Sequence, residues 1–134
     1  MRWLLRVFKK IKRMFVKPLE LKGMTVEQLL DACCGPAGRK IIAEKTGISE
    51  KLILKWTNHA DLFRINGIGP QFAELLEAAG VDTVKELRHR VAANLAAKVA
   101  EVNEEKHLCG RVPAEAEIQK MIDQAKELEP RMTY

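Results

Sequence analysis

Residues 62–80 read LFRINGIGPQFAELLEAAG, and this stretch decides the fold. Its two glycines, Gly67 and Gly69, bracket a single apolar residue, which is typical of a tight turn. Pro70 suits the first turn of a helix, because the N–H that proline lacks would have no partner there. The stretch therefore predicts a Gly-x-Gly turn that leads into a helix ending at Gly80.

Helix signals continue on both sides of this turn. Thr25 and Thr83 are each followed three residues later by Gln or Glu, which is the capping-box spacing. Gly47 suits the left-handed end of a helix, and Ser49 suits the cap of the next one. The predicted helices cover residues 25–34, 37–46, 50–58 and 70–79, a stretch from residue 83, residues 94–106 with Asn94 as cap, and a last stretch from residue 113.

The chain also holds a weak internal repeat, because residues 23–29 resemble residues 80–87 with one residue inserted. A turn and an Ala-containing helix follow each copy. Gly47 in the first copy and Asn103 in the second are candidates for the same left-handed helix end. The Gly-x-Gly turn precedes only the second copy.

Composition favours an all-α fold. Of 134 residues, 47% are apolar and 31% charged, as in a globular protein. Ala, Leu, Glu and Lys dominate, and clusters of strand-forming residues are missing. We therefore expect a compact bundle of six to eight short helices over residues 19–134, preceded by a separate segment over residues 1–18, with residues 130–134 as a tail.

Cysteine and histidine spacing predicts no metal site. The chain has three cysteines, Cys33, Cys34 and Cys109, and no C-x-x-C motif. An odd number of cysteines without such a motif does not suggest a disulfide framework, so we expect free thiols in a reducing compartment. His107 and Cys109 lie close enough to suggest a zinc ligand pair, but no second pair follows at a zinc spacing. We expect neither a metal nor a cofactor.

Positive charge is concentrated at the N-terminus. The formal charge is +5, yet residues 1–17 alone carry seven basic residues and no acidic one. The remaining chain has 16 basic and 18 acidic residues, a net of −2. The basic character of this protein therefore belongs to its first segment, and the body is slightly acidic.

This segment is amphipathic when placed on a helix at about 100° per residue. Apolar side chains fill one arc of roughly 140°, basic side chains fill the opposite side, and only Leu5 and Val16 break the separation. Pro18 then ends the helix. The apolar members are Trp3, Leu4, Val7, Phe8, Ile11, Met14 and Phe15. The basic members are Arg2, Arg6, Lys9, Lys10, Lys12, Arg13 and Lys17.

Three other roles do not fit the composition of this segment. Basic residues interrupt the apolar run that a secretory signal needs, and the run is too short to span a membrane. A transit peptide would be richer in Ser. Two interpretations stay open: a helix bound to an anionic membrane or a partner's groove, and a helix packed on the protein's own body with its basic face in solvent.

Residues 62–80 resemble a helix-hairpin-helix motif, and residues 23–134, about five-sixths of the chain, resemble a bacterial family described only as domain of unknown function 4332. The resemblance implies a fold built around helix-hairpin-helix units. The residues that carry it are Gly38-Arg39-Lys40, residues 45–52, Gly67-Ile68-Gly69, residues 79–87 and residues 102–106.

In the wider helix-hairpin-helix class, the backbone amides of the hairpin bind a nucleic-acid phosphate without reading sequence. That resemblance implies phosphate binding by Gly67, Ile68 and Gly69, with Arg64 as a nearby cation. DNA-binding members usually place Lys or Arg just after the second glycine, whereas this chain has Pro70 and no cation there. The departure favours protein docking, which other members of the class perform.

No catalytic constellation is apparent, so we expect no enzyme activity. His59, His89 and His107 are scattered in polar helical contexts and are expected at the surface. Residues 35–40 superficially resemble a phosphate loop but lack G-K-[ST] and a preceding strand. Residues 42–56 have helix-turn-helix spacing, for which helix packing is the simpler interpretation.

The sequence thus predicts a non-enzymatic adaptor in the cytoplasm. If the N-terminal segment binds a membrane, we expect the protein on the inner face of that membrane. Residues 1–17 would attach to an anionic membrane surface or a larger protein assembly, and the helical body would dock a protein partner. The alternative is a binder of the DNA backbone, with the hairpin on phosphate and the basic N-terminus as an arm. The sequence does not specify the oligomeric state.

Overall fold

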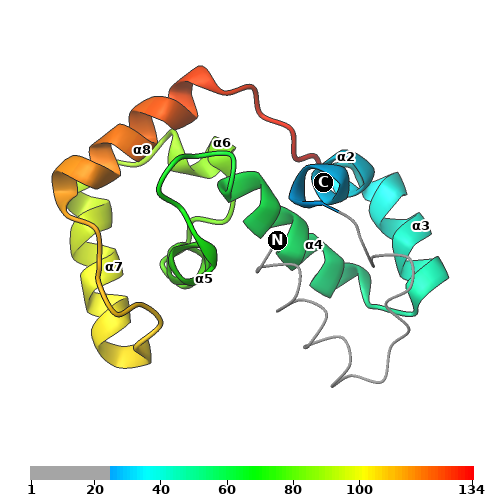
Figure 1. The fold of residues 1–134 in the computed structure, drawn as a ribbon, viewed down its shortest axis with the longest axis horizontal. Coiled ribbons are helices and arrows are strands. Elements are labelled where there is room, and N and C mark those ends of the chain that lie inside the picture. Colours follow the sequence, from blue (N-terminus) through cyan, green and yellow to red (C-terminus); the bar gives the residue numbers. More distant parts are fainter. Residues whose placement is uncertain (1–24) are drawn as a thin grey trace. The chain divides into compact units, whose positions relative to one another are not determined.

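The computed structural model describes residues 25–134 (Figure 1). The predicted amphipathic helix of residues 1–18, with its apolar and basic site residues, lies outside the described residues.

The described residues form seven α-helices and contain no strand, which confirms the all-α fold class. No helix among them is long and apolar enough to cross a membrane. The helices are α2 (Val26–Cys33), α3 (Pro36–Thr46), α4 (Glu50–Leu62), α5 (Pro70–Ala78), α6 (Val84–Leu87), α7 (Ala92–Lys106) and α8 (Glu115–Glu127).

The chain divides into two compact units. Of the described residues, 25–60 and 131–134 belong to the first unit, and residues 61–130 form the second. The last four residues therefore return to the first unit after the chain has completed the second. The prediction that residues 130–134 form a tail is wrong: Met132 is only 6% exposed, and Thr133 donates its N–H to the carbonyl of Cys34 at 2.8 Å.

Helix ends in the first unit follow the local sequence. Thr25 and Gln28 form a complete capping box at the start of α2, as predicted. Gly47 ends α3 with a φ of 76°, the left-handed conformation expected of it. The hydroxyl of Ser49 accepts the N–H of Leu52 at the start of α4.

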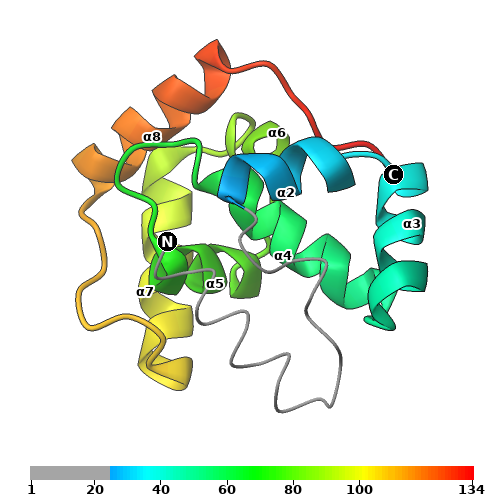
Figure 2. The ribbon, with the colours of Figure 1, turned by 45° about the vertical axis from the view of Figure 1, so that its right-hand side comes forward.

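The contact between α2 and α3 depends on a missing side chain. A Cβ atom added to Gly38 would lie 1.9 Å from the carbonyl oxygen of Ala32, so the two backbones approach too closely for any other residue. The two helices lie side by side in both ribbon views (Figure 2). Gly38 therefore sets the α2–α3 corner of the first unit.

The second unit has one continuous hydrophobic core, to which α5, α7 and α8 contribute most. Its α7 and α8 lie side by side (Figure 2). Helical spacing predicts an apolar face of Ile118, Met121, Ile122, Ala125 and Leu128 for the last helix, and the first four are buried in α8, while Leu128 follows the helix and is half-buried. Leu75 and Leu76 of α5 are fully buried in the same core.

Three local predictions in the body are wrong. The helix predicted over residues 50–58 continues to Leu62, because its last residues supply buried side chains to the core. Asn94 does not cap α7, which begins two residues earlier, after Val91 in extended conformation. Asn103 does not take the left-handed conformation. The left-handed residue at the end of α7 is His107, with a φ of 50°.

We predict that Gly38→Ala lowers the free energy of unfolding by about 3 kcal/mol, because the new methyl group must push the two backbones apart. Gly69→Ala is the matched control, since a Cβ there meets nothing within 4 Å and its φ of −101° suits any residue. Urea denaturation followed by circular dichroism compares the two variants. Equal stability of Gly38→Ala and Gly69→Ala would contradict the close approach.

Candidate functional site

The Gly-x-Gly turn is fixed by packing on one side and exposed on the other. Ile65 and Ile68 are buried, at 1% and 6% exposure, and Ile68 donates its N–H to the carbonyl of Ile65 at 3.3 Å. Gly67 is exposed and has a φ of +91°, which only glycine adopts without strain. Ile68 therefore anchors the turn to the core, while the glycines form its outer edge.

Gly67 needs to be glycine because of its positive φ, but Gly69 has no such backbone requirement. It is the N-cap residue of α5, in extended conformation, and no side chain caps this helix end. Open space surrounds the position of its missing Cβ atom. Neither backbone conformation nor packing in the described part of the chain explains a glycine here.

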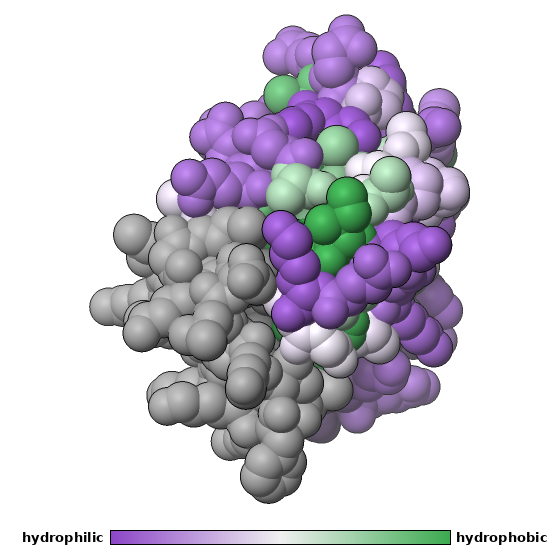
Figure 3. Space-filling view, turned by 90° about the vertical axis from the view of Figure 1, so that its right-hand side faces the viewer, coloured by the Kyte–Doolittle hydropathy of each residue, from purple (hydrophilic) through white to green (hydrophobic). Residues whose placement is uncertain are grey.

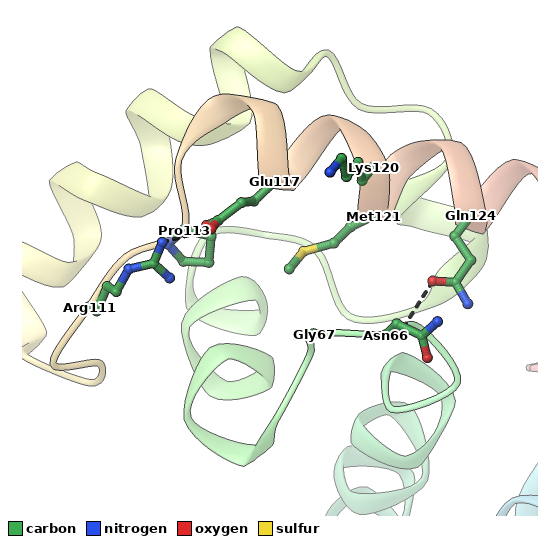
Figure 4. Close-up of a pocket in the computed structure, with 8 residues that line it drawn as sticks. All are labelled: Asn66, Gly67, Arg111, Pro113, Glu117, Lys120, Met121 and Gln124. Carbon is green, nitrogen blue, oxygen red and sulfur yellow. Dashed lines mark hydrogen bonds and ion pairs between the residues drawn. The ribbon is translucent and has the colours of Figure 1, made fainter.

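A hollow of about 490 Å³ lies beside the turn (Figure 4). Met121 of α8 points toward Gly67, and a Cβ atom on that glycine would lie 3.2 Å from the methyl carbon of Met121. Gln124 of α8 accepts the backbone N–H of Asn66 at 2.9 Å and so holds the turn against the helix. The hollow is lined by Asn66, Gly67, Arg111, Pro113, Glu117, Lys120, Met121 and Gln124.

The charges of this hollow come from residues far along the chain. Arg111 donates to Glu117 at 2.7 Å, and this hydrogen bond holds the pKa of the Glu117 carboxyl below its usual range. Lys120 is the second cation of the lining. The sequence did not predict either cation near the hairpin, because nothing local in residues 62–80 indicates that α8 and the loop before it pack there.

The predicted hairpin set is only partly brought together. Gly67, Ile68 and Gly69 are consecutive and share the turn, but Ile68 faces the core. Arg64 does not line the hollow. Its guanidinium instead bonds the carboxylate of Asp61 at 2.9 Å and the carbonyl of Glu129 at 2.7 Å.

Asp61 connects Arg64 to the rest of the second unit. The Asp61 side chain is almost fully buried, and its second oxygen accepts the N–H of Val84 at 2.8 Å, at the start of α6. The carboxylate is thus fully engaged by Arg64 on one side and by a helix N-terminus on the other. Arg64 therefore has a structural partner that its sequence neighbourhood did not predict.

All four arginines of the second unit donate to that unit itself. Besides Arg64 and Arg111, Arg88 donates to the carbonyl of Lys126 at 3.0 Å. Arg90 donates to the carboxylate of Glu86 and the carbonyl of Gly80. The second unit also has nine basic and thirteen acidic residues, a net of −4. This is a poor surface for a polyphosphate.

Titratable groups form no candidate metal site in residues 25–134. No three of their His, Cys, Asp and Glu side chains are grouped so that they could hold a metal ion. His89 and His107 are exposed as expected, but His59 is 3% exposed, so the surface prediction is wrong for it. Its position on the lengthened part of α4 explains the burial.

The three cysteines are free thiols. Burial raises the pKa of the Cys33 thiol, and the same cause raises the pKa of Cys109. Cys109 lies in a loop whose backbone is held at both polar groups by the side-chain amide of Asn103. Both environments disfavour the reactive thiolate.

Comparison with known proteins gives a family. The family model described as "Domain of unknown function (DUF4332)" matches residues 10–128. No curated protein matches the chain. No solved structure matches it either.

We predict that Asp61→Ala lowers the free energy of unfolding by about 3–5 kcal/mol, because it leaves a partly buried guanidinium and the Val84 N–H without their acceptor. Glu117→Ala is the control: it removes the exposed Arg111 ion pair and the acceptor of the Ala114 N–H, and it should lower the stability much less than Asp61→Ala does. Chemical denaturation of both variants measures the difference. Similar losses would show that Asp61 does not organise the second unit.

Proposed function

The chain belongs to the family described as domain of unknown function (DUF4332), and we propose that this protein is a non-enzymatic adaptor. Residues 1–17 attach it to an anionic membrane surface or a larger protein assembly. The helical body docks a protein partner. The observation that carries the proposal is the separation of charge: seven cations without an acid in residues 1–17, against a net charge of −4 in the second unit.

The N-terminal segment has the composition that attachment to an anionic surface requires. Each basic residue near such a surface contributes about 1 kcal/mol, and burial of Trp3, Phe8 and Phe15 adds to this. Micromolar affinity needs about 8 kcal/mol, which seven cations and three aromatic side chains can supply. A helix that only covered the body would not need a basic face free of acids.

The body has features that fit protein docking better than phosphate binding. Its second unit is acidic, and Arg64, the cation nearest the turn in sequence, bonds Asp61 and Glu129. Arg111, the arginine that lines the hollow, bonds Glu117. A phosphate ligand would have to compete with these carboxylates for both guanidinium groups.

We predict that the full-length chain sediments with vesicles of phosphatidylserine and phosphatidylcholine, and that deletion of residues 1–17 abolishes this. Phe8→Ser with Phe15→Ser should weaken binding about tenfold or more, because both side chains lie on the apolar arc. Leu5→Ser with Val16→Ser removes two apolar residues from outside the arc and is the matched control.

Vesicles of phosphatidylcholine alone should bind none of these proteins, since the electrostatic attraction is missing. Binding that survives the deletion, or that falls equally with both pairs of serine substitutions, would contradict the membrane arm of the proposal. Attachment to a protein assembly would then be the remaining role for the segment.

One alternative function has an observation in its favour, namely Gly69. A Ser, Thr, Asp or Asn would cap α5 at this position, so the glycine leaves the first amides of α5 open to an external acceptor. In the helix-hairpin-helix interpretation of residues 62–80, that acceptor is a phosphate of the DNA backbone, and Lys120 is a cation close to the turn.

Gly69→Ala tests this alternative without disturbing the fold. Substitution of Gly67 or Arg64 would disturb it, because Gly67 has a positive φ and Arg64 pairs with the buried Asp61. If the protein is an adaptor, a mobility-shift assay should show that Gly69→Ala does not change DNA binding, and that deletion of residues 1–17 removes any binding. A truncated body that still binds DNA, and loses that binding both on Gly69→Ala and with added salt, would assign the function to the hairpin.

A further inference from the structure

The last four residues, 131–134, are held against the first unit as a C-terminal strap. Arg131 forms an ion pair with Asp31 of α2. Thr133 donates its backbone N–H to the carbonyl of Cys34 at 2.8 Å. Met132, between them, is 6% exposed. The strap lies beside α2 in Figure 1, and it is bound through its backbone and its side chains together.

Arg39 of α3 is the centre of this attachment. Its side chain is buried, and its guanidinium donates to the carbonyls of Cys33 and Cys34 at 3.0 and 3.1 Å and to that of Thr133 at 2.7 Å. The ring of Tyr134 lies 5.8 Å from the same guanidinium. No carboxylate in the described part of the chain pairs with Arg39.

A buried guanidinium without a carboxylate depends on carbonyl acceptors. Two of its three come from the end of α2 and are fixed by the fold, but the third, on Thr133, comes from the strap. If the strap leaves, Arg39 keeps a vacant donor aimed at the place of an extended main chain. The α2–α3 corner therefore presents a preformed site for a peptide carbonyl.

The strap can leave without unfolding any helix. Helix α8 ends at Glu127, Leu128 is already extended, and Glu129 and Pro130 are exposed. On the α3 side, the coloured part of the surface shows a hydrophobic area bordered by hydrophilic residues (Figure 3), and Ile41 is the exposed large hydrophobic residue of α3, at 52%. An apolar slot vacated by Met132 would be a new feature of the first unit.

We propose that this groove at the α2–α3 corner is a peptide-docking site that the strap occupies in cis, and that an extended segment of a protein partner takes its place. The chemistry of the strap defines the partner segment: a basic residue opposite Asp31, an apolar residue in the Met132 slot, a main-chain carbonyl on Arg39, and an aromatic residue over the guanidinium. The proposal rests on the proposed function in that it names how the body docks its partner.

The strap acts as a competitor with a high effective concentration. A short tether typically holds its ligand at about millimolar effective concentration, so a free peptide of moderate affinity is excluded while the strap is bound. Weakening the strap should therefore expose the site. This relation distinguishes a docking groove from ordinary packing of residues 131–134.

The test uses a fluorescein-labelled peptide with the sequence of residues 129–134 and measures anisotropy with the full chain and two variants. One variant lacks residues 131–134, and the other keeps them but carries Arg131→Glu with Met132→Ser. Both variants should bind the peptide at least about tenfold more tightly than the full chain. A peptide with Ser in place of Met is the matched control and should bind weakly to all three.

Arg39→Gln in either variant should remove peptide binding, because the guanidinium contacts the carbonyl of the bound segment. Circular dichroism and thermal unfolding establish that the variants are folded. Failure of both strap variants to fold would make the strap a part of the core and overturn the proposal, as would folded variants that do not bind.

A strap-exchanged dimer of the full chain, detected by light scattering at increasing concentration, would assign the groove to a second copy and also overturn it. None of these measurements involves vesicles or residues 1–17. A negative peptide result therefore leaves the attachment of the N-terminal segment untouched, and a negative vesicle result leaves the groove untouched.

Discussion

The buried carboxylate of Asp61 is the interaction on which the second unit depends. It lies at the end of α4, accepts the first N–H of α6 at Val84 and pairs with Arg64, whose guanidinium also reaches the carbonyl of Glu129. A four-residue helix such as α6 is unstable alone, so a fixed acceptor at its N-terminus determines where it forms. One side chain therefore connects the first, middle and last segments of residues 61–130. This use of Arg64 removes a guanidinium from the candidate surface at the same time.

The sequence was informative wherever structure is decided by neighbours along the chain. The capping boxes and Gly47 act over three to five residues, and the helix ends predicted from them are present. Predictions failed where contacts between residues far apart in the sequence determine the structure. α4 runs past Asn58 because its last turn is buried, and α7 begins before Asn94 because the extended Val91 starts it without a side-chain cap. The C-terminal residues look like a tail by composition, and only contacts with residues about 100 positions earlier in the chain, on Asp31, Cys34 and Arg39, hold them in place.

The same distinction applies to the candidate site. The Gly-x-Gly turn and the need for glycine at Gly67 follow from local pattern, since a positive φ is what such a turn requires. The hollow beside it does not, because Arg111, Lys120 and Gln124 reach the turn only through the packing of α8. Counting cations in the sequence near residue 67 therefore underestimates the charge at the turn, while counting arginines overestimates the donors available to a ligand. Whether a guanidinium is available to a ligand depends on whether a carboxylate already binds it. Asp61 binds Arg64, and Glu117 binds Arg111.

Arg39 is the contrasting case, and the contrast indicates where binding is expected. An arginine held by a buried carboxylate, as Asp61 holds Arg64, is neutralised and keeps its partner when a ligand arrives, because breaking a buried charged pair is costly. Among residues 25–134, the hydrogen-bond acceptors of Arg39 are all carbonyl oxygens, and one of them belongs to four residues that no helix secures. Exchange of one peptide carbonyl for another at Arg39 conserves the hydrogen bond and the charge balance, so replacement of the strap has a small electrostatic cost. In the second unit, Arg88 also donates to a carbonyl, but that carbonyl belongs to Lys126 inside α8 and is fixed by the helix, whereas at the corner of α2 and α3 the carbonyl comes from residues outside any helix.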